Sequence, residues 1–230
     1  MHKEFLPDFR YIFANPFFIT RRHLYRNIKD LSAHFGTGLL LDIGCGTKPY
    51  ASMFPRVNYK GLDYRKSGTN QNRDADFLYD GGKFPLRPNT FDYALATEVL
   101  EHVFEPDYFV REISRILKPG GLLLLTVPFI WDEHEQPYDF GRYTSFGIKA
   151  LLERNGFVII EQRKTGGFIE TLGQLFCTYL YYLLSKRRFV YRLSLPFLFA
   201  PIQLLTIVFE KLLPKNQGFY LDNILLCKKK

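Results

Sequence analysis

The chain has 230 residues, with 31 Lys plus Arg against 23 Asp plus Glu, and therefore a formal net charge of +8. A chain of this length can bury a large apolar core without disulfide or metal staples. The three cysteines, Cys45, Cys177 and Cys227, show no Cys-x-x-Cys or Cys/His ligand spacing. This pattern disfavours a disulfide scaffold and a structural zinc site, so we expect no metal ligands.

The N-terminal residues do not resemble a secretory signal. Residues 1–15 mix Lys3, Glu4, Asp8 and Arg10 among aromatic side chains, without a continuous apolar stretch. We therefore expect a reducing, cytoplasmic location.

The positive charge is concentrated in the flanks of the chain. Residues 1–38 carry six basic and three acidic side chains, residues 39–165 carry sixteen and seventeen, and residues 166–230 carry nine and three. A nearly neutral middle argues against a nucleic-acid groove through it, and basic flanks favour an anionic surface as partner. Solvated charges without a partner are the equal alternative.

The first predicted element is an amphipathic helix over residues 21–35. Basic residues surround one apolar face, which is formed by Leu24, Ile28, Leu31 and Phe35. This pattern is typical of a helix that packs on one side. We expect residues 1–38 to form an N-terminal helical lid over a ligand.

Short apolar runs then alternate with helical patterns over residues 39–165. Apolar residues at helical spacing predict a helix over 107–117, which Pro119-Gly120-Gly121 would end. We predict an α/β fold with a doubly wound, mostly parallel, seven-stranded Rossmann-like sheet that binds ligands beyond the carboxyl ends of its strands. The strand candidates are residues 39–43, 59–62, 76–79, 91–96, 121–127, 157–160 and 220–226.

Residues 166–218 form an apolar, basic-bordered helical insertion, and residues 219–230 return to the core with its last strand. The longer apolar run, 193–209, has seventeen residues and is broken by Pro196 and Pro201. It is shorter than the ~20 residues that a bilayer core requires, so we do not expect a membrane span. The insertion suits shallow binding to an anionic membrane, and equally a homodimer interface or a substrate lid.

Two glycines stand where the first predicted strand must turn. Gly44 and Gly46 would let a ligand lie against the bare backbone. The dinucleotide fingerprint needs a third glycine where this chain has Pro49, which argues against nicotinamide or flavin cofactors. Asp42, in front of the turn, points to a ligand with a positive group. Asp63, after the second strand, has the spacing of a carboxylate that accepts ribose hydroxyls.

These motifs belong to an ordered series that resembles a known family. The series is Leu41-Asp-Ile-Gly-Cys-Gly-Thr47, Gly61-Leu-Asp63, Tyr79-Asp80, Phe91-Asp92, Glu98-Val-Leu-Glu-His102 and Arg115-Ile-Leu-Lys-Pro-Gly-Gly121. It is similar to the class I S-adenosylmethionine-dependent methyltransferases, closest to the small type 11 methyltransferase domain, over roughly residues 38–165. The resemblance implies S-adenosyl-L-methionine as cofactor and in-line transfer of its methyl group.

The resemblance also implies a cofactor site. In it, Asp42 would face the methionine ammonium, Asp63 the ribose and Asp80 the adenine amine. The full set of implied cofactor-binding residues is Asp42, Gly44, Cys45, Gly46, Asp63, Asp80 and Thr97.

The acceptor side should come from the segments after the fourth and fifth strands. Our candidate catalytic residues are His134, then His102, with Glu98 beside them. Either histidine could act as a base or as a hydrogen-bonding group. As an alternative, His102 could simply pair with Glu98 or Glu101.

Residues 133–144 are similar to a stretch that recurs in some family members, Glu-His-x-x-Pro-x-Asp-x-x-Arg-Tyr-Thr. We take Tyr138, Arg142 and Tyr143 as candidate substrate-binding residues. Alternatively, Asp139 and Arg142, three residues apart, would form a salt bridge that braces the loop.

Together these features predict a methyltransferase for a small or lipid-linked acceptor, cytoplasmic or peripheral at the inner membrane surface. A non-catalytic S-adenosylmethionine-binding or membrane/oligomer interaction protein of the same fold is one alternative, and an RNA methyltransferase is another. Nucleic acid is disfavoured, because residues 96–99, Ala-Thr-Glu-Val, lack the Asn/Asp-Pro-Pro-aromatic motif of enzymes that methylate base amines.

Overall fold

The computed structural model of the chain describes residue 5 and residues 7–65 and 74–230. It divides into two compact units. One unit consists of residues up to 27 together with 164–222, and the other of residues 28–163 together with 223–230. The second, larger unit contains nearly all of the β-sheet, and the first contains the helices of the apolar insertion.

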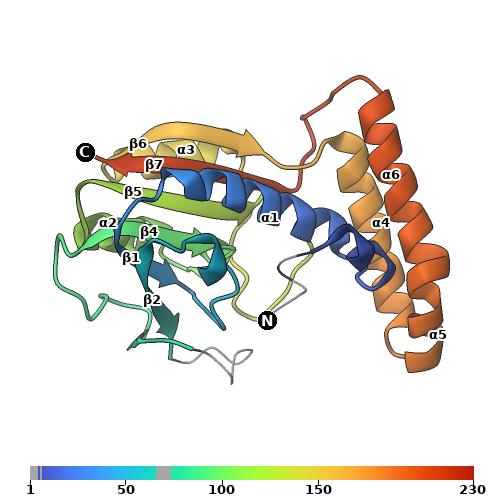
Figure 1. Cartoon of the computed structure of the whole chain (residues 1–230), viewed down its shortest axis with the longest axis horizontal. Coiled ribbons are helices and arrows are strands. Elements are labelled where there is room, and N and C mark those ends of the chain that lie inside the picture. The colour runs from blue at the N-terminus through green and yellow to red at the C-terminus, as the bar shows by residue number, and fades with distance from the viewer. Residues whose placement is uncertain (1–4, 6, 66–73) are drawn as a thin grey trace. The chain divides into compact units, whose positions relative to one another are not determined.

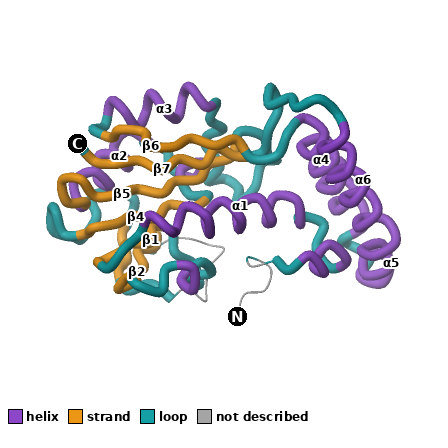
Figure 2. The backbone as a smooth tube through the Cα atoms, turned by 45° about the horizontal axis from the view of Figure 1, so that its top comes forward, coloured by secondary structure: helices purple, strands orange, loops and turns teal. Residues whose placement is uncertain are grey.

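The larger unit is built on a seven-stranded sheet (Figures 1 and 2). Its strands lie in the order β3-β2-β1-β4-β5-β7-β6. Neighbouring strands from β3 to β5 pair in parallel, whereas the arrow of β7 runs opposite to that of β6 (Figure 1). The strands are β1 (Gly38–Ile43), β2 (Val57–Tyr64), β3 (Phe77–Tyr79), β4 (Phe91–Thr97), β5 (Leu117–Pro128), β6 (Phe157–Lys164) and β7 (Asp222–Lys229). This arrangement confirms the predicted doubly wound sheet.

The sheet order reverses beside β1. From β1 the chain proceeds through β2 to β3 on one side, and then returns to β4 and β5 on the other. In sheets of this type, ligands bind where the order reverses, outside the carboxyl ends of the strands. The glycine turn after β1 therefore lies at the position that the fold reserves for a ligand.

The central strands consist of continuous apolar runs because both faces of the sheet are covered. Leu41 of β1, Ala94 of β4 and Leu123 of β5 are fully buried. Helices α2 (Pro106–Ile116) and α3 (Ser145–Arg154) add side chains to the same core cluster, among them Val110, Ile113, Ile148 and Leu152. Burial of each large apolar side chain contributes about 1.5–3 kcal/mol. The alternation of strand and helix therefore follows from hydrophobic patterning.

The turn predicted at Pro119-Gly120-Gly121 lies inside β5 rather than before it. Pairing with β4 is interrupted between Leu117 and Leu122, where the register shifts. Gly120, within this bulge, has a φ of +78°, a conformation that favours glycine. Helix α2 therefore ends at Ile116 and the chain enters β5 at once.

The smaller unit is helical. Helix α1 (Phe18–Leu31) begins in this unit, which also contains α4 (Phe168–Leu184), α5 (Arg188–Ser194) and α6 (Ala200–Leu212). Helices α4 and α6 run side by side (Figures 1 and 2). The helix predicted over 21–35 is confirmed, shifted toward the N-terminus, and its role as a lid stays a prediction. Short 3-10 helices occupy Phe9–Phe13, Ser32–His34, Ala51–Met53 and Leu100–His102 (η4).

Buried polar groups hold these helices together. Glu170 of α4 has a carboxylate oxygen 2.6 Å from Nε2 of His23, and the Nε2 of Gln174 donates to the carbonyl of Pro16 at 3.1 Å. The carboxylate of Glu210 on α6 accepts the backbone N–H groups of Ile169 and Glu170, each at 3.0 Å. Glu210 thus caps the N-terminus of α4, where the helix dipole favours a negative charge.

The expectation that prolines break the longer apolar run is wrong. Residues Arg188–Leu212 form one continuous helix of 25 residues. A π-helical turn over Leu195–Phe199, in which the N–H of Ala200 donates to Leu195, joins α5 to α6. The wider turn accommodates the missing donor and the ring of Pro196. By length and composition this is the one helix, among the described residues, that could cross a membrane; 28% of its apolar window is buried.

Candidate active site

The parallel strands bring the predicted cofactor residues to one edge of the sheet. Asp42 is the penultimate residue of β1 and Asp63 that of β2, and the register pairs Asp42 with Gly61. Thr97 ends the adjacent strand β4. The carboxylates of Asp42 and Asp63 therefore lie close enough that the charge of Asp63 raises the pKa of Asp42.

The turn after β1 is formed by bare backbone. Gly44 has a φ of +71° and Gly46 a φ of +49°, and both values lie in the region that favours glycine. A Cβ atom on Gly44 would lie 2.4 Å from a Cγ of Val99. The N–H of Gly44 donates to the carbonyl of Leu62 at 2.8 Å, which holds the turn against β2. The turn thus tolerates no side chain at Gly44.

Asp42 is a buried carboxylate with one oxygen left open. Asp42 is 2% exposed. Tyr59 donates its hydroxyl to Oδ2 at 2.6 Å, whereas Oδ1 is buried without a hydrogen-bond partner among the described residues. Burial raises the pKa of Asp42 to about 7, against the hydrogen bond from Tyr59. A buried carboxylate in this state favours a cationic ligand.

The other implied cofactor residues differ in their surroundings. Asp63 is 5% exposed and accepts the N–H of Tyr64 at 2.7 Å. Asp80 is exposed, and the Nε of Arg65 lies 3.1 Å from one of its carboxylate oxygens. Burial raises the pKa of the Cys45 thiol, so Cys45 packs as a neutral side chain.

Asp76 also lies at this edge, although no motif in the sequence predicts a role for it. Its carboxylate accepts the ammonium of Lys48 and the backbone N–H of Gly61, both at 2.8 Å, and the ammonium of Lys60 at 3.1 Å. Burial alone would raise the pKa of Asp76, but these bonds lower it to about 2. The positive charge of Lys48 is thereby held by Asp76.

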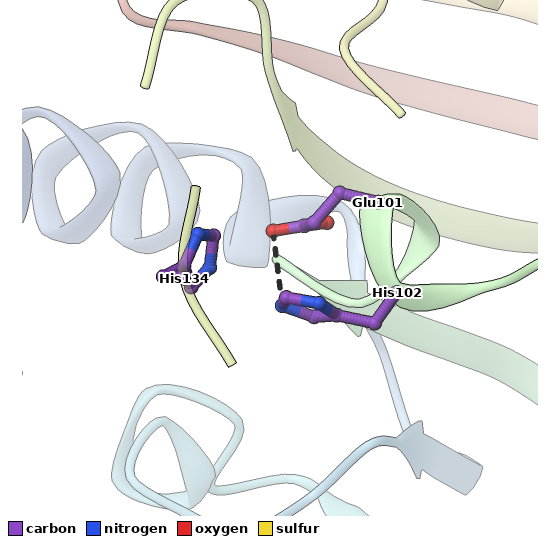
Figure 3. Close-up of side chains that lie close together, drawn as sticks. All are labelled: Glu101, His102 and His134. Carbon is purple, nitrogen blue, oxygen red and sulfur yellow. Dashed lines mark ion pairs between the residues drawn. The ribbon is translucent and has the colours of Figure 1, made fainter. Parts of the chain in front are cut away.

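On the acceptor side, the predicted residues His102 and His134 come together from two segments, whereas Glu98 bonds to β5. Glu98 follows β4, has a φ of +53°, and accepts the hydroxyl of Thr126 of β5 at 2.7 Å. The rings of His102 and His134 meet edge to face, with centroids 4.7 Å apart. His102 Nε2 also lies 3.8 Å from Glu101, the alternative pairing foreseen from the sequence. Figure 3 shows Glu101, His102 and His134.

The loop after β5 is braced by one ion pair. Arg142 binds both carboxylate oxygens of Asp139, at 2.6 and 2.7 Å, and donates to the carbonyl of Asp132 at 2.7 Å. Asp139 in turn accepts the N–H of His134 at 2.9 Å. This geometry supports the bracing alternative for Arg142, which orders the segment that carries His134.

The two remaining candidate substrate residues lie on either side of this brace. Tyr138 is exposed, at 51%, and its carbonyl faces the ring of His102 at 2.7 Å. Tyr143 is half-buried, and its carbonyl accepts the amide of Asn223 at 2.7 Å. Their roles in substrate binding stay predictions.

Comparison with known proteins finds a family whose domain resembles the core of the chain. Residues 41–125 match the methyltransferase domain family. The chain is 28% identical over 130 residues to the thiol S-methyltransferase TMT1B of Mus musculus. The alignment covers 51% of each chain. The chain spans about half the length of the curated relatives that it matches.

Solved structures share the fold. The cyclase SpnF superposes with a TM-score of 0.58 at 22% identity, over 90% of this chain and 82% of its own. Phosphoethanolamine N-methyltransferase 2 of Haemonchus contortus, in complex with phosphomonomethylethanolamine and S-adenosylhomocysteine, gives a TM-score of 0.56 at 19% identity, over 96% of this chain and 56% of its own. These names include a thiol and an amine methyltransferase and a cyclase, so the fold does not identify the acceptor.

Proposed function

Because the chain carries a class I S-adenosylmethionine-dependent methyltransferase domain, we propose that the protein transfers a methyl group from this cofactor to a small or lipid-linked acceptor. The observation that carries the proposal is the pair of buried carboxylates, Asp42 and Asp63, beside the glycine turn. Two neighbouring buried anions repel each other unless a ligand supplies positive charge or hydrogen-bond donors.

S-adenosylmethionine fits this part of the chain. Oδ1 of Asp42, which is buried and open, would accept the ammonium of the methionine part. Asp63 would accept the ribose hydroxyls, and the backbone at Gly44 and Gly46 would leave room for the ligand to pass. When bound, the cofactor supplies an electrophilic methyl group on a sulfonium sulfur.

The acceptor would meet the residues that follow β4 and β5. Methyl transfer needs alignment of the two reactants and exclusion of water more than it needs a strong catalyst group. A base is required only where the acceptor must lose a proton, and His134 or His102 would take that proton. Arg142 would act as a positioning residue, since it fixes the loop that carries His134.

Helices α4 to α6 support a lipid-linked acceptor and a peripheral position at a membrane. Large apolar side chains are exposed there, among them Tyr179 at 59%, Phe197 at 76% and Leu212 at 73%. Basic residues border them at Lys186, Arg187, Arg188, Arg192, Lys211 and Lys215. Apolar surface beside basic side chains suits the interface of an anionic membrane. A dimer interface or a substrate lid would use the same surface.

Calorimetry and a transfer assay test the proposal together. We expect one molecule of S-adenosylmethionine to bind per chain, and labelled methyl groups to reach the lipid or small-molecule fraction of a cell extract. Absence of binding by the cofactor and by its demethylated product would refute the proposal. Binding without transfer to any fraction would favour the non-catalytic alternative.

A further inference from the structure

Three electron-rich side chains converge on the acceptor side of the site. A carboxylate oxygen of Glu101 and one ring nitrogen each of His102 and His134 lie within 4.8 Å of one another. Glu101 is fully buried, at 0% exposure, and the two imidazoles are partly buried. Figure 3 shows the carboxylate and both rings turned toward a common point. We infer that Glu101, His102 and His134 bind a divalent first-row transition metal ion such as Zn²⁺.

The hydrogen bonds around the two histidines fix which ring atom is available. Nδ1 of His102 lies 2.7 Å from the carbonyl oxygen of Tyr138, and because a carbonyl only accepts, Nδ1 carries the proton. Nδ1 of His134 lies 3.2 Å from the carbonyl of Asp132 and 3.3 Å from a carboxylate oxygen of Asp139. In the neutral form of each ring, Nε2 would therefore be the atom that offers a lone pair.

This is the arrangement in which proteins present histidine to a metal. A metal-binding imidazole usually donates its second N–H to a carbonyl or a carboxylate, which fixes the tautomer and the orientation of the ring. Here each ring has such a partner, and Asp139 is itself held by Arg142. The hydrogen-bond partners that orient the two rings are therefore in place without a metal.

A metal ion would bind all three side chains, whereas a proton on His102 would join only His102 and Glu101. If His102 were protonated, its Nε2 would pair with Glu101, 3.8 Å away, and the lone pair of His134 would have no part in the contact. A buried carboxylate is stabilised by positive charge, and a metal ion would supply it to the carboxylate and to both lone pairs at once. The convergence of the second imidazole thus favours the metal.

The donor set indicates the class of metal. Two imidazole nitrogens and one carboxylate suit Zn²⁺ and its first-row neighbours, whereas Mg²⁺ and Ca²⁺ prefer oxygen alone. Ligand atoms around tetrahedral Zn²⁺ lie about 3.3 Å apart, given bonds of about 2.0–2.1 Å, so the separations between the three side chains, now within 4.8 Å, would close by up to about 1.5 Å. Three protein ligands leave a position open, as in catalytic zinc sites.

The open position indicates the kind of acceptor. A bound transition metal lowers the pKa of a hydroxyl or thiol that binds to it. Resting on the proposed function, the metal site would therefore take an acceptor with an ionisable O–H or S–H group. Cysteine spacing in the sequence predicted no metal ligands. The fold brings His134, on a separate loop, beside Glu101 and His102.

Zinc titration of metal-stripped, untagged protein tests the inference. Isothermal calorimetry with ZnCl₂ should show one site per chain, and CoCl₂ should give the visible absorption of bound Co²⁺. We expect His102→Ala, His134→Ala and Glu101→Gln each to weaken Zn²⁺ binding by about 100-fold or more, since loss of an outer partner alone costs roughly 10- to 100-fold. His34→Ala, which removes an exposed histidine, is the matched control and should leave the affinity unchanged. MgCl₂ should not compete.

The outcomes separate the metal from the proposed function. Titration of S-adenosylmethionine on the same samples should be unaffected by Glu101→Gln, and circular dichroism should show that each variant is folded. Absence of a one-to-one Zn²⁺ site, or a site that survives both histidine substitutions, would overturn the metal inference while cofactor binding stands. If cofactor binding fails and Zn²⁺ binding persists, the proposed function is wrong and the metal site remains.

Discussion

Replacement of Asp42 by asparagine should stabilise the fold at high pH while it weakens cofactor binding. Asparagine has nearly the same size, and its side-chain oxygen can still accept the hydroxyl of Tyr59, which now binds Asp42 at 2.6 Å. The substitution removes the charge that burial disfavours. It also removes the open oxygen that we assign to the methionine ammonium.

The magnitude follows from the pKa of Asp42. Burial raises this pKa from 3.8 to about 7, so the folded state holds the proton more tightly than the unfolded state. The wild-type carboxyl therefore contributes most stability below its unfolded pKa and loses it as the pH rises from about 4 to about 7. At about 1.4 kcal/mol per pH unit, the loss is on the order of 4 kcal/mol. The unpaired amide of Asp42→Asn costs a pH-independent amount of about 1–3 kcal/mol.

Urea denaturation of both proteins at a series of pH values measures this effect. The difference in the free energy of unfolding, variant minus wild type, should rise by about 1.4 kcal/mol per pH unit from about pH 4 and level off above about pH 7. The affinity for S-adenosylmethionine should fall by roughly 10- to 100-fold, because a hydrogen bond to a charged group is worth about 1.5–3 kcal/mol. Parallel stability curves across this range would refute the buried, proton-binding state of Asp42.

Three further predictions concern the cofactor edge and the apolar helices. Asp63→Ala should weaken S-adenosylmethionine binding severalfold or more in calorimetry, and an unchanged affinity would remove its ribose role. Gly44→Ala should lower the free energy of unfolding by more than about 1–2 kcal/mol, which is the cost of a left-handed conformation alone. The loss exceeds this cost because the new methyl group also clashes with Val99. Adding Val99→Ala should restore only the part of the stability that the clash removes. Phe197→Glu, at a residue 76% exposed, should abolish sedimentation with anionic vesicles without unfolding the protein. Loss of a dimer instead would assign this surface to self-association.

The order of strands and helices could be predicted because each depends on local pattern. The apolar runs at β1, β4 and β5 are buried on both sides, and short apolar runs between helical patterns are typical of a parallel sheet. The glycine turn could also be predicted, since Gly44 and Gly46 adopt positive φ values that few other residues tolerate. Such features are set within a few residues of sequence.

Two predicted breaks, at Pro196 and at Pro119-Gly120-Gly121, differ from the structure because the surrounding backbone continues through them. Proline usually ends a helix, but the π turn at Leu195–Phe199 carries the chain past Pro196 as one helix. In β5, the glycines after Pro119 form a bulge within the strand rather than a turn before it. In both places the backbone adopts an irregular conformation, a π turn or a β-bulge, that the sequence pattern does not indicate.

Side-chain pairing across the sheet edge could not be predicted either, although it decides which acidic residue is free to bind a ligand. Asp76 is held by Lys48, and Glu98 accepts a hydrogen bond from Thr126. The ion pair of Asp139 with Arg142 is the exception, because their spacing of three residues predicted it. Asp76 precedes β3 and Glu98 follows β4, and the sequence alone does not distinguish them from Asp42, near the end of β1. The partners of Asp76 and Glu98 come from the turn after β1 and from β5, each 28 residues away in the sequence, so only the folded chain identifies them.

The way each acid is compensated therefore gives an argument about its role. An acid whose charge is held by a lysine or an arginine of the same chain, such as Asp76 or Asp139, fixes the backbone near it. Asp42 has a neutral partner, Tyr59, and a pKa near neutrality. A buried acid of this kind is costly to the fold, and it is retained where a ligand completes it. We therefore propose that the cofactor binds at Asp42, whose buried Oδ1 has no hydrogen-bond partner among the described residues.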